Sequence, residues 1–308
     1  MDYLFLVVAL TLIVVGAMLL TDGSVALARR MHIPEFIVGL TVVAVGTSMP
    51  EMAVSMISTV GGHGDMAIGN VVGSNIANTL LILGVCALFS PVLFTKSNVR
   101  RDVPLNLIVS VLLLIVAYTS ASINRWEGVL LLAVYVAMML YSIRADRKAM
   151  TESKDEAVEE MSALRIIVWI VAGLAGLIYG GDLFVDSATS IATAWGVSEA
   201  VIAISLVAVG TSLPELAASL ASILKGSPSM ALGNVIGSNI ANILLILGAC
   251  STVSPLTLQG VSMMDIYVVL GSAVLLLLSA LFIGDKRITR IEGLLFVIVY
   301  GAYIYTLI

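Results

Sequence analysis

The sequence GTSMPEMAVS at residues 46–55 returns almost unchanged as GTSLPELAAS at residues 210–219. A second stretch behaves in the same way. GNVVGSNIANTLLILG at residues 69–84 returns as GNVIGSNIANILLILG at residues 233–248. Both pairs are separated by 164 positions, so the chain is predicted to contain two copies of one unit.

The duplication extends well beyond these motifs. The offset of 164 holds without a gap over residues 22–91 of the first copy. A weaker echo links RWEG at residues 125–128 with RIEG at residues 290–293, where the offset is one residue longer. A solenoid array would show more than two short repeats. We therefore expect one duplicated architecture rather than a row of small units.

The composition places both copies in a membrane. Of the 308 residues, 60% are hydrophobic and 11% are charged, and the mean hydropathy is +1.11. A soluble domain carries about 25% charged residues, so most of this surface cannot face water. Apolar runs of about 18 or more residues recur along the chain, each long enough to cross a bilayer as a helix. Strands would be shorter and would alternate in character, so we expect an α-helical membrane protein rather than a barrel.

The apolar runs predict ten transmembrane helices. Their approximate limits are residues 3–28, 35–60, 65–89, 102–121, 126–144, 163–192, 198–224, 229–253, 262–283 and 289–307. With the N-terminus outside, the outer loops contain one basic residue, Arg125, and the cytoplasmic loops contain fourteen. These are Arg29, Arg30, Lys96, Arg100, Arg101, Arg144, Arg147, Lys148, Lys154, Arg165, Lys225, Lys286, Arg287 and Arg290. This positive-inside bias predicts a multi-pass protein of the cell membrane, with both termini outside and the basic loops in the cytoplasm.

Each copy contains an odd number of predicted spans, which has a geometric consequence. The first repeat, residues 1–144, enters the membrane from outside, so the second repeat, residues 163–308, must enter from the cytoplasm. The predicted fold is therefore an all-α membrane protein with ten transmembrane helices in two inverted five-helix repeats. Its repeated motifs cover residues 46–84 and 210–248. Inverted repeats are typical of secondary transporters, whose binding sites lie near the bilayer midplane.

The linker between the repeats, residues 145–162, is strongly polar. Its sequence, ADRKAMTESKDEAVEEMS, mixes both signs of charge. We expect a solvated cytoplasmic loop or short helix, and the alternative is a Ca2+-sensing role for its acidic cluster. The linker is too short to fold as a separate regulatory domain.

Each repeated motif places one carboxylate inside an apolar span, Glu51 in the second span and Glu215 in the seventh. An ionisable residue at membrane depth costs about 2.5–3.5 kcal/mol on insertion scales, so such a residue indicates a functional site. The alternative is a structural glutamate that is hydrogen-bonded between helices. Asp22 and Asp186 form another equivalent pair, near the ends of the first and sixth spans. For these we expect an interfacial or helix-packing role, with ion funnelling as the alternative.

A proline precedes each glutamate. Pro50 and Pro214 cannot donate a backbone hydrogen bond, and each ring clashes with the carbonyl group four residues earlier, so each helix should kink or break. Carbonyl oxygens freed in this way persist in a membrane only where they line a cavity or meet a ligand. The same turns carry four hydroxyl groups, those of Thr47, Ser48, Thr211 and Ser212.

The second motif supplies the opposing wall of the predicted site. It contains small-xxx-small pairs, for which we expect close helix packing. These pairs are Gly69 with Gly73 and Gly233 with Gly237. One turn later, polar residues spaced four apart share a helix face. They are Ser74 with Asn78 and Ser238 with Asn242. For Asn75 and Asn239 we favour interhelical hydrogen bonds over ion contact.

The predicted ligand atoms are all oxygens. Two carboxylates with hydroxyl and amide oxygens suit Ca2+, Na+ or Mg2+, whereas Zn2+ or copper sites would use cysteine or histidine. Mg2+ is disfavoured because it keeps its waters. Two carboxylates about 4 Å apart repel by about 4 kcal/mol at an effective dielectric of 20, so a bound cation should stabilise the pair. We therefore predict that only cation-loaded forms switch sides readily, as an exchanger requires.

The motifs GTS-x-PE and GN-x-x-GSN-x-x-N, each present twice, resemble the α-repeats of the cation/Ca2+ antiporter superfamily and, within it, the prokaryotic Na+/Ca2+ exchanger branch. The resemblance implies a secondary active antiporter that exchanges Na+ for Ca2+ by alternating access. It also implies ion sites formed by spans 2, 3, 7 and 8, across which spans 1 and 6 slide. Glu51 and Glu215 would be the carboxylates shared by Ca2+ and Na+. The other implied ligands are Thr47 and Thr211 for Ca2+, Ser48, Ser74, Ser212, Ser238 and the carbonyl groups of Ala44 and Ala208 for Na+, and Asn78 and Asn242 in the central layer.

The sequence differs at two points from other branches of this superfamily. Some relatives, including K+-dependent ones, carry an aspartate at the position of Asn242, and its absence argues against K+ co-transport. The acidic motif GN-x-x-E of the proton-coupled branch is also absent from the sequence. A Ca2+/H+ or Na+/H+ antiporter on the same scaffold is the nearest alternative. A channel is disfavoured because a closed oxygen cage between two inverted halves suits alternating access better than a continuous pore.

An enzyme is the alternative from another class. Gly62-His63-Gly64-Asp65 matches the G-x-G-D pattern of intramembrane aspartyl proteases, but it falls in a predicted outer loop, without a second mid-span aspartate to form a dyad. We expect no enzymatic activity and no cofactor. The expected partners are Ca2+, Na+ and the lipid bilayer, with H+ as a further candidate ion, no nucleic acid, and a monomer as the functional unit.

Overall fold

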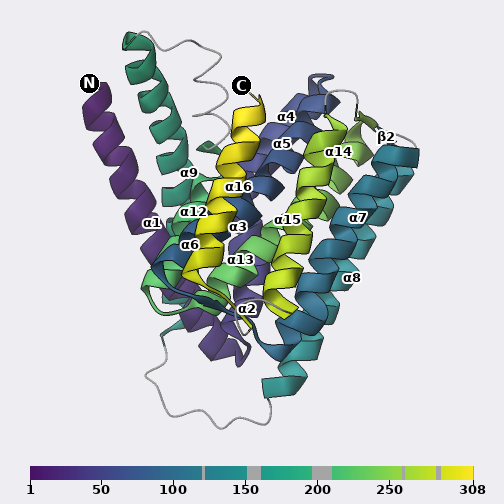
Figure 1. Cartoon of the computed structure of the whole chain (residues 1–308). Helices are drawn as coiled ribbons and strands as arrows, with labels where there is room; N and C mark the ends of the chain where they lie inside the picture. The colour runs from purple at the N-terminus through teal and green to yellow at the C-terminus, as the bar shows by residue number, and fades with distance from the viewer. Residues whose placement is uncertain (120–121, 151–160, 196–209, 259–260, 282–285, 308) are drawn as a thin grey trace.

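The computed structural model describes residues 1–119, 122–150, 161–195, 210–258, 261–281 and 286–307, and nearly all of them are helical (Figure 1). In the first half, where η denotes a π-helical segment, the helices are α1 (Asp2–Met31), α2 (Glu35–Val38), η1 (Gly39–Val43), α3 (Ala44–Thr47), α4 (Met49–Val60), α5 (Gly64–Ile76), η2 (Ala77–Ile82), α6 (Leu83–Phe89), η3 (Asn98–Asp102), α7 (Val103–Thr119) and α8 (Arg125–Met150). In the second half they are α9 (Ala163–Ala194), α12 (Leu213–Leu224), α13 (Pro228–Ile240), η5 (Ala241–Ile246), α14 (Leu247–Val253), α15 (Met263–Leu281) and α16 (Arg290–Leu307).

These helices confirm that the chain is an α-helical membrane protein. Among the described residues, eight helices are long and apolar enough to cross a membrane, or nine if the bent segment at residues 35–60 is one span. The seventh predicted span, residues 198–224, lies partly outside the described residues. Its described part is α12, which is apolar but has only 12 residues and is therefore too short to cross a bilayer alone.

The predicted linker begins within a helix. Helix α8 continues from the first repeat to Met150, so residues 145–150 of the linker are helical, which is one of the two forms expected for it. The residues at this end are mostly Ala, Arg, Lys and Met, all of which are strong helix formers, so their polarity does not end the helix. Most of the remaining linker, residues 151–160, lies outside the described part of the chain.

Two short sheets join the halves. Strand β1 (Val92–Leu93) pairs antiparallel with β4 (Arg287–Ile288). Strand β3 (Leu256–Thr257) is the repeat equivalent of β1, and it pairs antiparallel with β2 (Ser122–Ile123). Each half therefore gives the same strand to the other half.

The fifth helix of each half also packs on the other half. A Cβ atom built at Gly128 of α8 would lie 2.8 Å from the carbonyl oxygen of Gly248, and one at Gly293 of α16 would lie 2.7 Å from that of Gly84. The glutamate before each of these glycines accepts a backbone N–H group at the start of its helix. The echo between RWEG and RIEG thus has two physical causes, a helix start and a close helix crossing.

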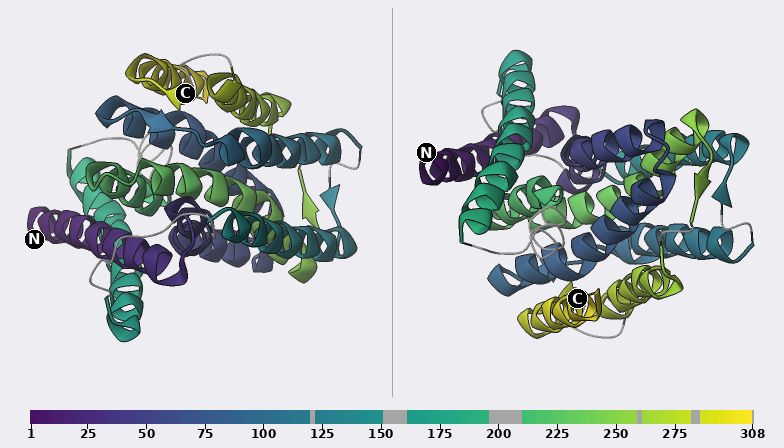
Figure 2. Two further views of the ribbon diagram at one scale, coloured as in Figure 1. Left: turned by 90° about the horizontal axis from the view of Figure 1, so that it is seen from below. Right: turned by 90° about the horizontal axis from the view of Figure 1, so that it is seen from above.

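Equivalent helices of the two halves run in opposite directions. Figure 1 shows that α8 begins at the end of the molecule where β2 lies, whereas α16 finishes near that end, at the C-terminus. The N-terminus lies at the same end. Seen from below and above, α1 and α9 cross at one side of the molecule, while α15 and α16 lie at another (Figure 2).

The core follows the two spans that carry the second motif. Within the apolar 18-residue stretch of each span, the share of buried residues is 94% in Pro228–Val253 and 78% in Gly64–Phe89, against 33% in α1 and 22% in α9. Helices α1 and α9 nevertheless pack closely on each other, since a Cβ atom at Gly173 would lie 2.5 Å from the backbone nitrogen of Leu20. They form a tight pair at the periphery of a densely packed centre.

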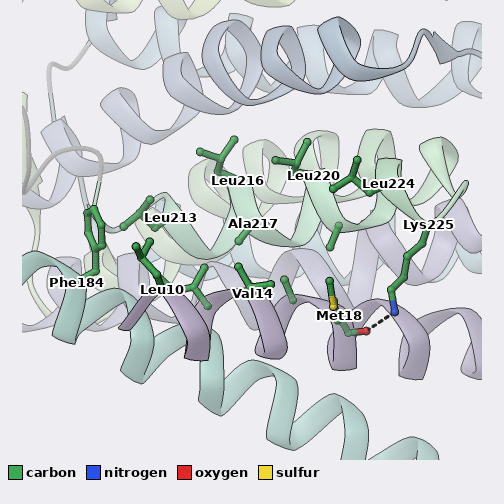
Figure 3. A pocket seen from close by; sticks show the side chains of 13 residues that line it. Leu10, Val14, Met18, Phe184, Leu213, Leu216, Ala217, Leu220, Leu224 and Lys225 are labelled. Carbon is green, nitrogen blue, oxygen red and sulfur yellow. Dashed lines mark hydrogen bonds between the residues drawn. The ribbon is translucent and has the colours of Figure 1, made fainter. Parts of the chain in front are cut away.

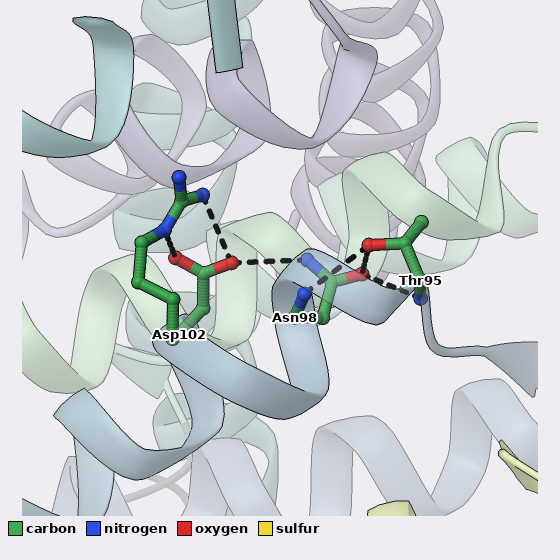
Figure 4. Close-up of polar contacts among 4 residues, drawn as sticks. Thr95, Asn98 and Asp102 are labelled. Atoms are coloured by element: carbon green, nitrogen blue, oxygen red, sulfur yellow. Dashed lines mark hydrogen bonds and ion pairs between the residues drawn. The ribbon is translucent and has the colours of Figure 1, made fainter. Parts of the chain in front are cut away.

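A buried polar network holds the start of α7 (Figure 4). The Asn98 Oδ1 atom accepts hydrogen bonds from the Thr95 backbone N–H (2.9 Å) and hydroxyl (2.7 Å). Asn98 Nδ2 donates to Asp102 at 3.2 Å, and Asp102 forms a 2.8 Å ion pair with Arg101. Asn98 and Asp102 are each 1% exposed, and a buried charge is costly unless it is paired and hydrogen-bonded, as this one is.

Candidate ion-binding site

The two glutamates follow equivalent breaks in the backbone. At Ser48 (φ −82°, ψ 8°) and Ser212 (φ −89°, ψ 2°) the chain leaves the helical region. Residues 35–47 are bent by 44° against residues 49–60. The kink predicted at Pro50 is confirmed, and its cause is the missing N–H group of proline together with its ring.

The serine at each break does not cap its own helix. The spacing Ser-x-x-Glu would allow a capping box, in which the serine accepts a hydrogen bond from the N–H group three residues later. In these fully described turns neither Ser48 nor Ser212 does so. The Ser48 hydroxyl instead donates a 2.9 Å hydrogen bond to Oε1 of Glu215, in the other half. The motif therefore connects the two repeats.

Both carboxylates are withdrawn from water and lie near each other. Glu51 and Glu215 are each 1% exposed, and their charges are close enough to repel. The Ser212 hydroxyl interacts electrostatically with Glu51 but does not form a hydrogen bond of normal geometry. Each carboxylate lies in the first turn of its helix, where the helix dipole stabilises negative charge by about 0.3–1 kcal/mol. Burying two anions costs several kcal/mol each, so binding of a cation or of protons would stabilise the pair.

Two asparagines that the motifs did not mark as functional support the glutamates. Asn70 Nδ2 donates to the backbone oxygen of Glu51 (3.3 Å) and to Oγ of Ser55 (3.0 Å). Asn234 makes the equivalent bonds in the second half, to the backbone oxygen of Glu215 (3.4 Å) and to the equivalent serine (2.9 Å). The sequence feature that could have identified these two asparagines is their position as the second residue of the repeated GN motif.

Equivalent π-helical segments interrupt both spans of the second motif. Segment η2 contains Asn78 and packs against α12, and η5 contains Asn242 and packs against α4. π-Helical turns are rare and occur frequently at functional sites. Asn242 Nδ2 donates to Oδ1 of Asn75 at 3.1 Å, and Asn239 Nδ2 donates to Oγ1 of Thr79 at 2.8 Å. The interhelical hydrogen bonds predicted for Asn75 and Asn239 are confirmed.

Six buried oxygen atoms of predicted ligands have no hydrogen-bond partner in the described part of the chain. They are Oε2 of Glu51 and Glu215, Oδ1 of Asn78 and Asn242, and Oγ of Ser212 and Ser238. Leaving a buried polar atom unsatisfied costs about 1–3 kcal/mol, so a ligand that contacts these oxygens would remove that cost. Over the same described residues, no three His, Cys, Asp or Glu side chains gather as a metal site. A cation here would be held by two carboxylates and neutral oxygens, which suits Ca2+ and Na+.

Three further predicted ligands, Thr211, Ser74 and Ala44, have surroundings of other kinds in the described part of the chain. Thr211 is half-buried and lines a cavity of about 640 Å³ beside α9, whereas its equivalent Thr47 is fully buried near Glu215. Ser74 lines a cavity of about 290 Å³. The carbonyl oxygen of Ala44 accepts a backbone N–H group at 3.1 Å. Ala208 lies outside the described residues.

Comparison with known proteins identifies the family of the chain. A sequence model of the family described as "sodium/calcium exchanger protein" matches residues 1–144 and 165–308. The chain therefore belongs to the sodium/calcium exchanger protein family, and the predicted relationship to the cation/Ca2+ antiporter superfamily is confirmed.

Individual relatives match over almost the whole chain. The putative antiporter CaxA of Alkalimonas amylolytica is 38% identical over 99% of this chain and 98% of its own length. The sodium/calcium exchanger MaX1 of Methanosarcina acetivorans is 31% identical over 99% of this chain and 98% of its own. A solved structure of the sodium-calcium exchanger NCX_Mj, soaked with zero Na+ and Ca2+, superposes with a TM-score of 0.87 at 31% identity, covering 100% of this chain and 99% of that one.

Proposed function

We propose that this protein is a secondary antiporter that exchanges Na+ for Ca2+ across the cell membrane by alternating access. The observation that carries the proposal is the pair of buried glutamates, one from each half, among acceptor oxygens that have no donor in the described residues. Membership of the sodium/calcium exchanger protein family and the name of its relative MaX1 support Na+ and Ca2+ as the two ions.

Glu51 and Glu215 bind Ca2+ and Na+ in turn, and neutral oxygens complete each shell. Thr47 and Thr211 add oxygens for Ca2+, and Asn78 and Asn242 lie in the central layer. The Na+ ligands are Ser48, Ser74, Ser212, Ser238 and the carbonyl groups of Ala44 and Ala208. The hydrogen bond from Ser48 to Glu215 supports this arrangement, because it brings ligands from both halves to one place.

The architecture we propose has ten transmembrane helices in two inverted five-helix repeats. The ten are the eight long helices, the bent segment at residues 35–60 and the span that ends in α12. The opposite directions of α8 and α16, the reciprocal sheets and the position of both termini at one end support the inversion. The distribution of basic residues assigns that end to the outside of the cell.

Charge balance explains why such a site exchanges ions instead of leaking them. Two carboxylates about 4 Å apart repel by about 4 kcal/mol at an effective dielectric of 20, so closing the protein around an empty pair is unfavourable. A bound Ca2+, or Na+ ions in its place, removes this repulsion. Only the loaded forms then pass readily between the two orientations.

The test is uptake of radiolabelled Ca2+ into proteoliposomes. Vesicles loaded with Na+ and diluted into Na+-free buffer should accumulate Ca2+, while vesicles loaded with K+ should not. A pH gradient imposed without Na+ separates the proton-coupled alternative, which would then drive uptake. Ca2+ entry that is equally fast with no counter-cation inside would contradict exchange altogether.

A further inference from the structure

Two equivalent crevices border the segments that carry the glutamates. The first lies between α1 and α12, is lined almost entirely by apolar side chains (Figure 3) and has a volume of about 310 Å³. The second lies between α9 and α4 and has a volume of about 640 Å³. The duplication relates them, since Ala17 and Ala221 of the first crevice correspond to Gly181 and Ile57 of the second.

Lys225 bridges the two helices of the smaller crevice. It follows the last residue of α12, and its Nζ atom forms an ion pair with Asp22 of α1. The same atom donates a 3.2 Å hydrogen bond to the backbone oxygen of Met18, also in α1 (Figure 3). The side chains of Lys225 and Asp22 are 28% and 40% exposed, so the pair lies at the edge of the protein rather than in its core. One side chain therefore ties α12 to α1.

No such bridge spans the larger crevice among the residues that the structure describes, although the backbone at the equivalent position has the same conformation. The repeat equivalent of Lys225 is Gly61, and that of Asp22 is Asp186. The two backbones agree, with φ −88° and ψ 4° at Lys225 against φ −71° and ψ −2° at Gly61, and each is followed by a glycine of positive φ (79° and 83°). Among the described residues Asp186 has no ion-pair partner. The halves differ here by one side chain and not by the course of the chain.

We propose that the ion pair between Lys225 and Asp22 is a latch that holds the cytoplasmic crevice shut, with no counterpart at the outer crevice. The proposal rests on the alternating access proposed above, in which one crevice closes as the other opens. The basic loop that contains Lys225 lies on the cytoplasmic side of that topology. An attraction between α1 and α12 stabilises the orientation in which this side is closed, and the crevice of about twice the volume, between α9 and α4, is then the open one. The latch therefore favours, in the ion-free protein, the orientation that is open to the outside of the cell.

The experiment measures access to the smaller crevice directly. In a protein carrying Cys86→Ala and Cys250→Ala, the further substitution Ala217→Cys places one thiol among the lining residues of this crevice. Its modification by a membrane-impermeant maleimide is followed in inside-out vesicles without Na+ or Ca2+. Lys225→Gly, which copies the residue of the other half, should raise the labelling rate by about two- to fivefold, the range for a partly exposed ion pair. Asp22→Asn should do the same.

Matched variants separate a latch from a general loss of packing. The charge exchange Asp22→Lys with Lys225→Asp should restore slow labelling, and Asp186→Asn should leave the rate unchanged. Labelling that does not rise in Lys225→Gly and Lys225→Gln, or that stays fast in the charge-exchanged protein, would overturn the latch. Labelling requires no transport, so a failure of Na+-driven Ca2+ uptake in the parent protein would be recognised separately.

The reciprocal substitution tests the asymmetry. Gly61→Lys is compatible with the local backbone and would offer an ammonium group to Asp186 at the outer crevice. With the thiol moved to Val54, which lines that crevice, labelling from the outside should slow by about two- to fivefold. An unchanged or faster rate would contradict the claim that this one missing side chain leaves the outer crevice without a latch.

Discussion

The centre and the periphery of the molecule use repeat-equivalent carboxylates in opposite ways. In the centre, Glu51 and Glu215 are equally buried, at 1% exposure, and each is supported by an asparagine through equivalent hydrogen bonds. At the periphery, Asp22 is paired with Lys225, whereas Asp186 is exposed. The halves have stayed alike where, in the proposed site, one ion contacts both of them. They have diverged where, in the proposed topology, they face different sides of the membrane.

The most severe test of this comparison removes a central charge. Glu51→Gln and Glu215→Gln should each lower Na+-driven Ca2+ uptake by on the order of a hundredfold, or about 2.7 kcal/mol, because each leaves a divalent ion with one carboxylate. Uptake into proteoliposomes measures the effect. The control is Glu127→Gln, which removes a half-buried charge at the start of α8 and should exchange ions normally. Equal losses in the two site variants are expected, and unimpaired exchange in either would remove that glutamate from the site.

The packing of the centre should be nearly as intolerant of change as its charges. A Cβ atom at Gly237 would lie 2.4 Å from the carbonyl oxygen of Leu40, so Gly237→Ala must push two helices apart at a cost of about 1–3 kcal/mol. Gly271 is a matched control, because a Cβ atom there meets nothing within 4 Å among the described residues. Thermal unfolding in detergent should show a clearly lower midpoint for Gly237→Ala alone. Similar midpoints for the two variants would mean that the centre is looser than its distances indicate.

The supporting asparagines should have intermediate effects. Asn234→Ala removes the donor to the backbone oxygen of Glu215 and leaves a serine hydroxyl without its partner, which should weaken apparent Ca2+ affinity by about five- to tenfold. Asn70→Ala should act in the same direction through Glu51, by less, because Asn70 is only half-buried. Ca2+ titration of uptake measures both. A change in maximal rate with unaltered affinity would argue against a role in positioning the ligands.

The smallest effect is expected at the exposed aspartate. Asp186→Asn should change Ca2+ uptake by less than about twofold, and only at low salt, because an exposed charge is screened within about 10 Å at 0.1 M ionic strength. Uptake rates at two ionic strengths measure it. A loss comparable to that of Glu51→Gln would show that the exposed Asp186 contributes to transport as strongly as the buried glutamates.

Much of the fold was visible in the chain because membrane helices carry strong local signals. A long apolar run is stable as a helix within a bilayer, so the limits of helices such as α1 and α9 agree closely with the predicted spans. Proline chemistry is equally local, which is why the bend after Thr47 was predictable. Helix α8 continues beyond the predicted span through residues 145–150 because most of these residues, although several are charged, favour helix.

The site was predictable in its charged members and less so in its neutral ones. A carboxylate in an apolar span is costly and therefore conspicuous, so Glu51 and Glu215 were assigned from the motif. Asparagines are common in helices that cross one another, and nothing in the motif distinguishes Asn70, which holds a backbone oxygen, from Asn78, which has none of its amide atoms bonded in the described residues. Thr47 and Thr211 occupy equivalent positions in the chain but not equivalent surroundings.

Local patterns along the chain were enough to predict a duplicated helical membrane protein with one carboxylate in an apolar span of each half, because hydropathy, proline and repetition act within a few turns of one helix. The hydrogen bond from Ser48 to Glu215, in place of a helix cap, and the ion pair between Lys225 and Asp22 follow instead from the packing of the two halves. These contacts join segments far apart in the chain. They depend on how whole helices pack, and a packed arrangement can place identical motifs in different surroundings.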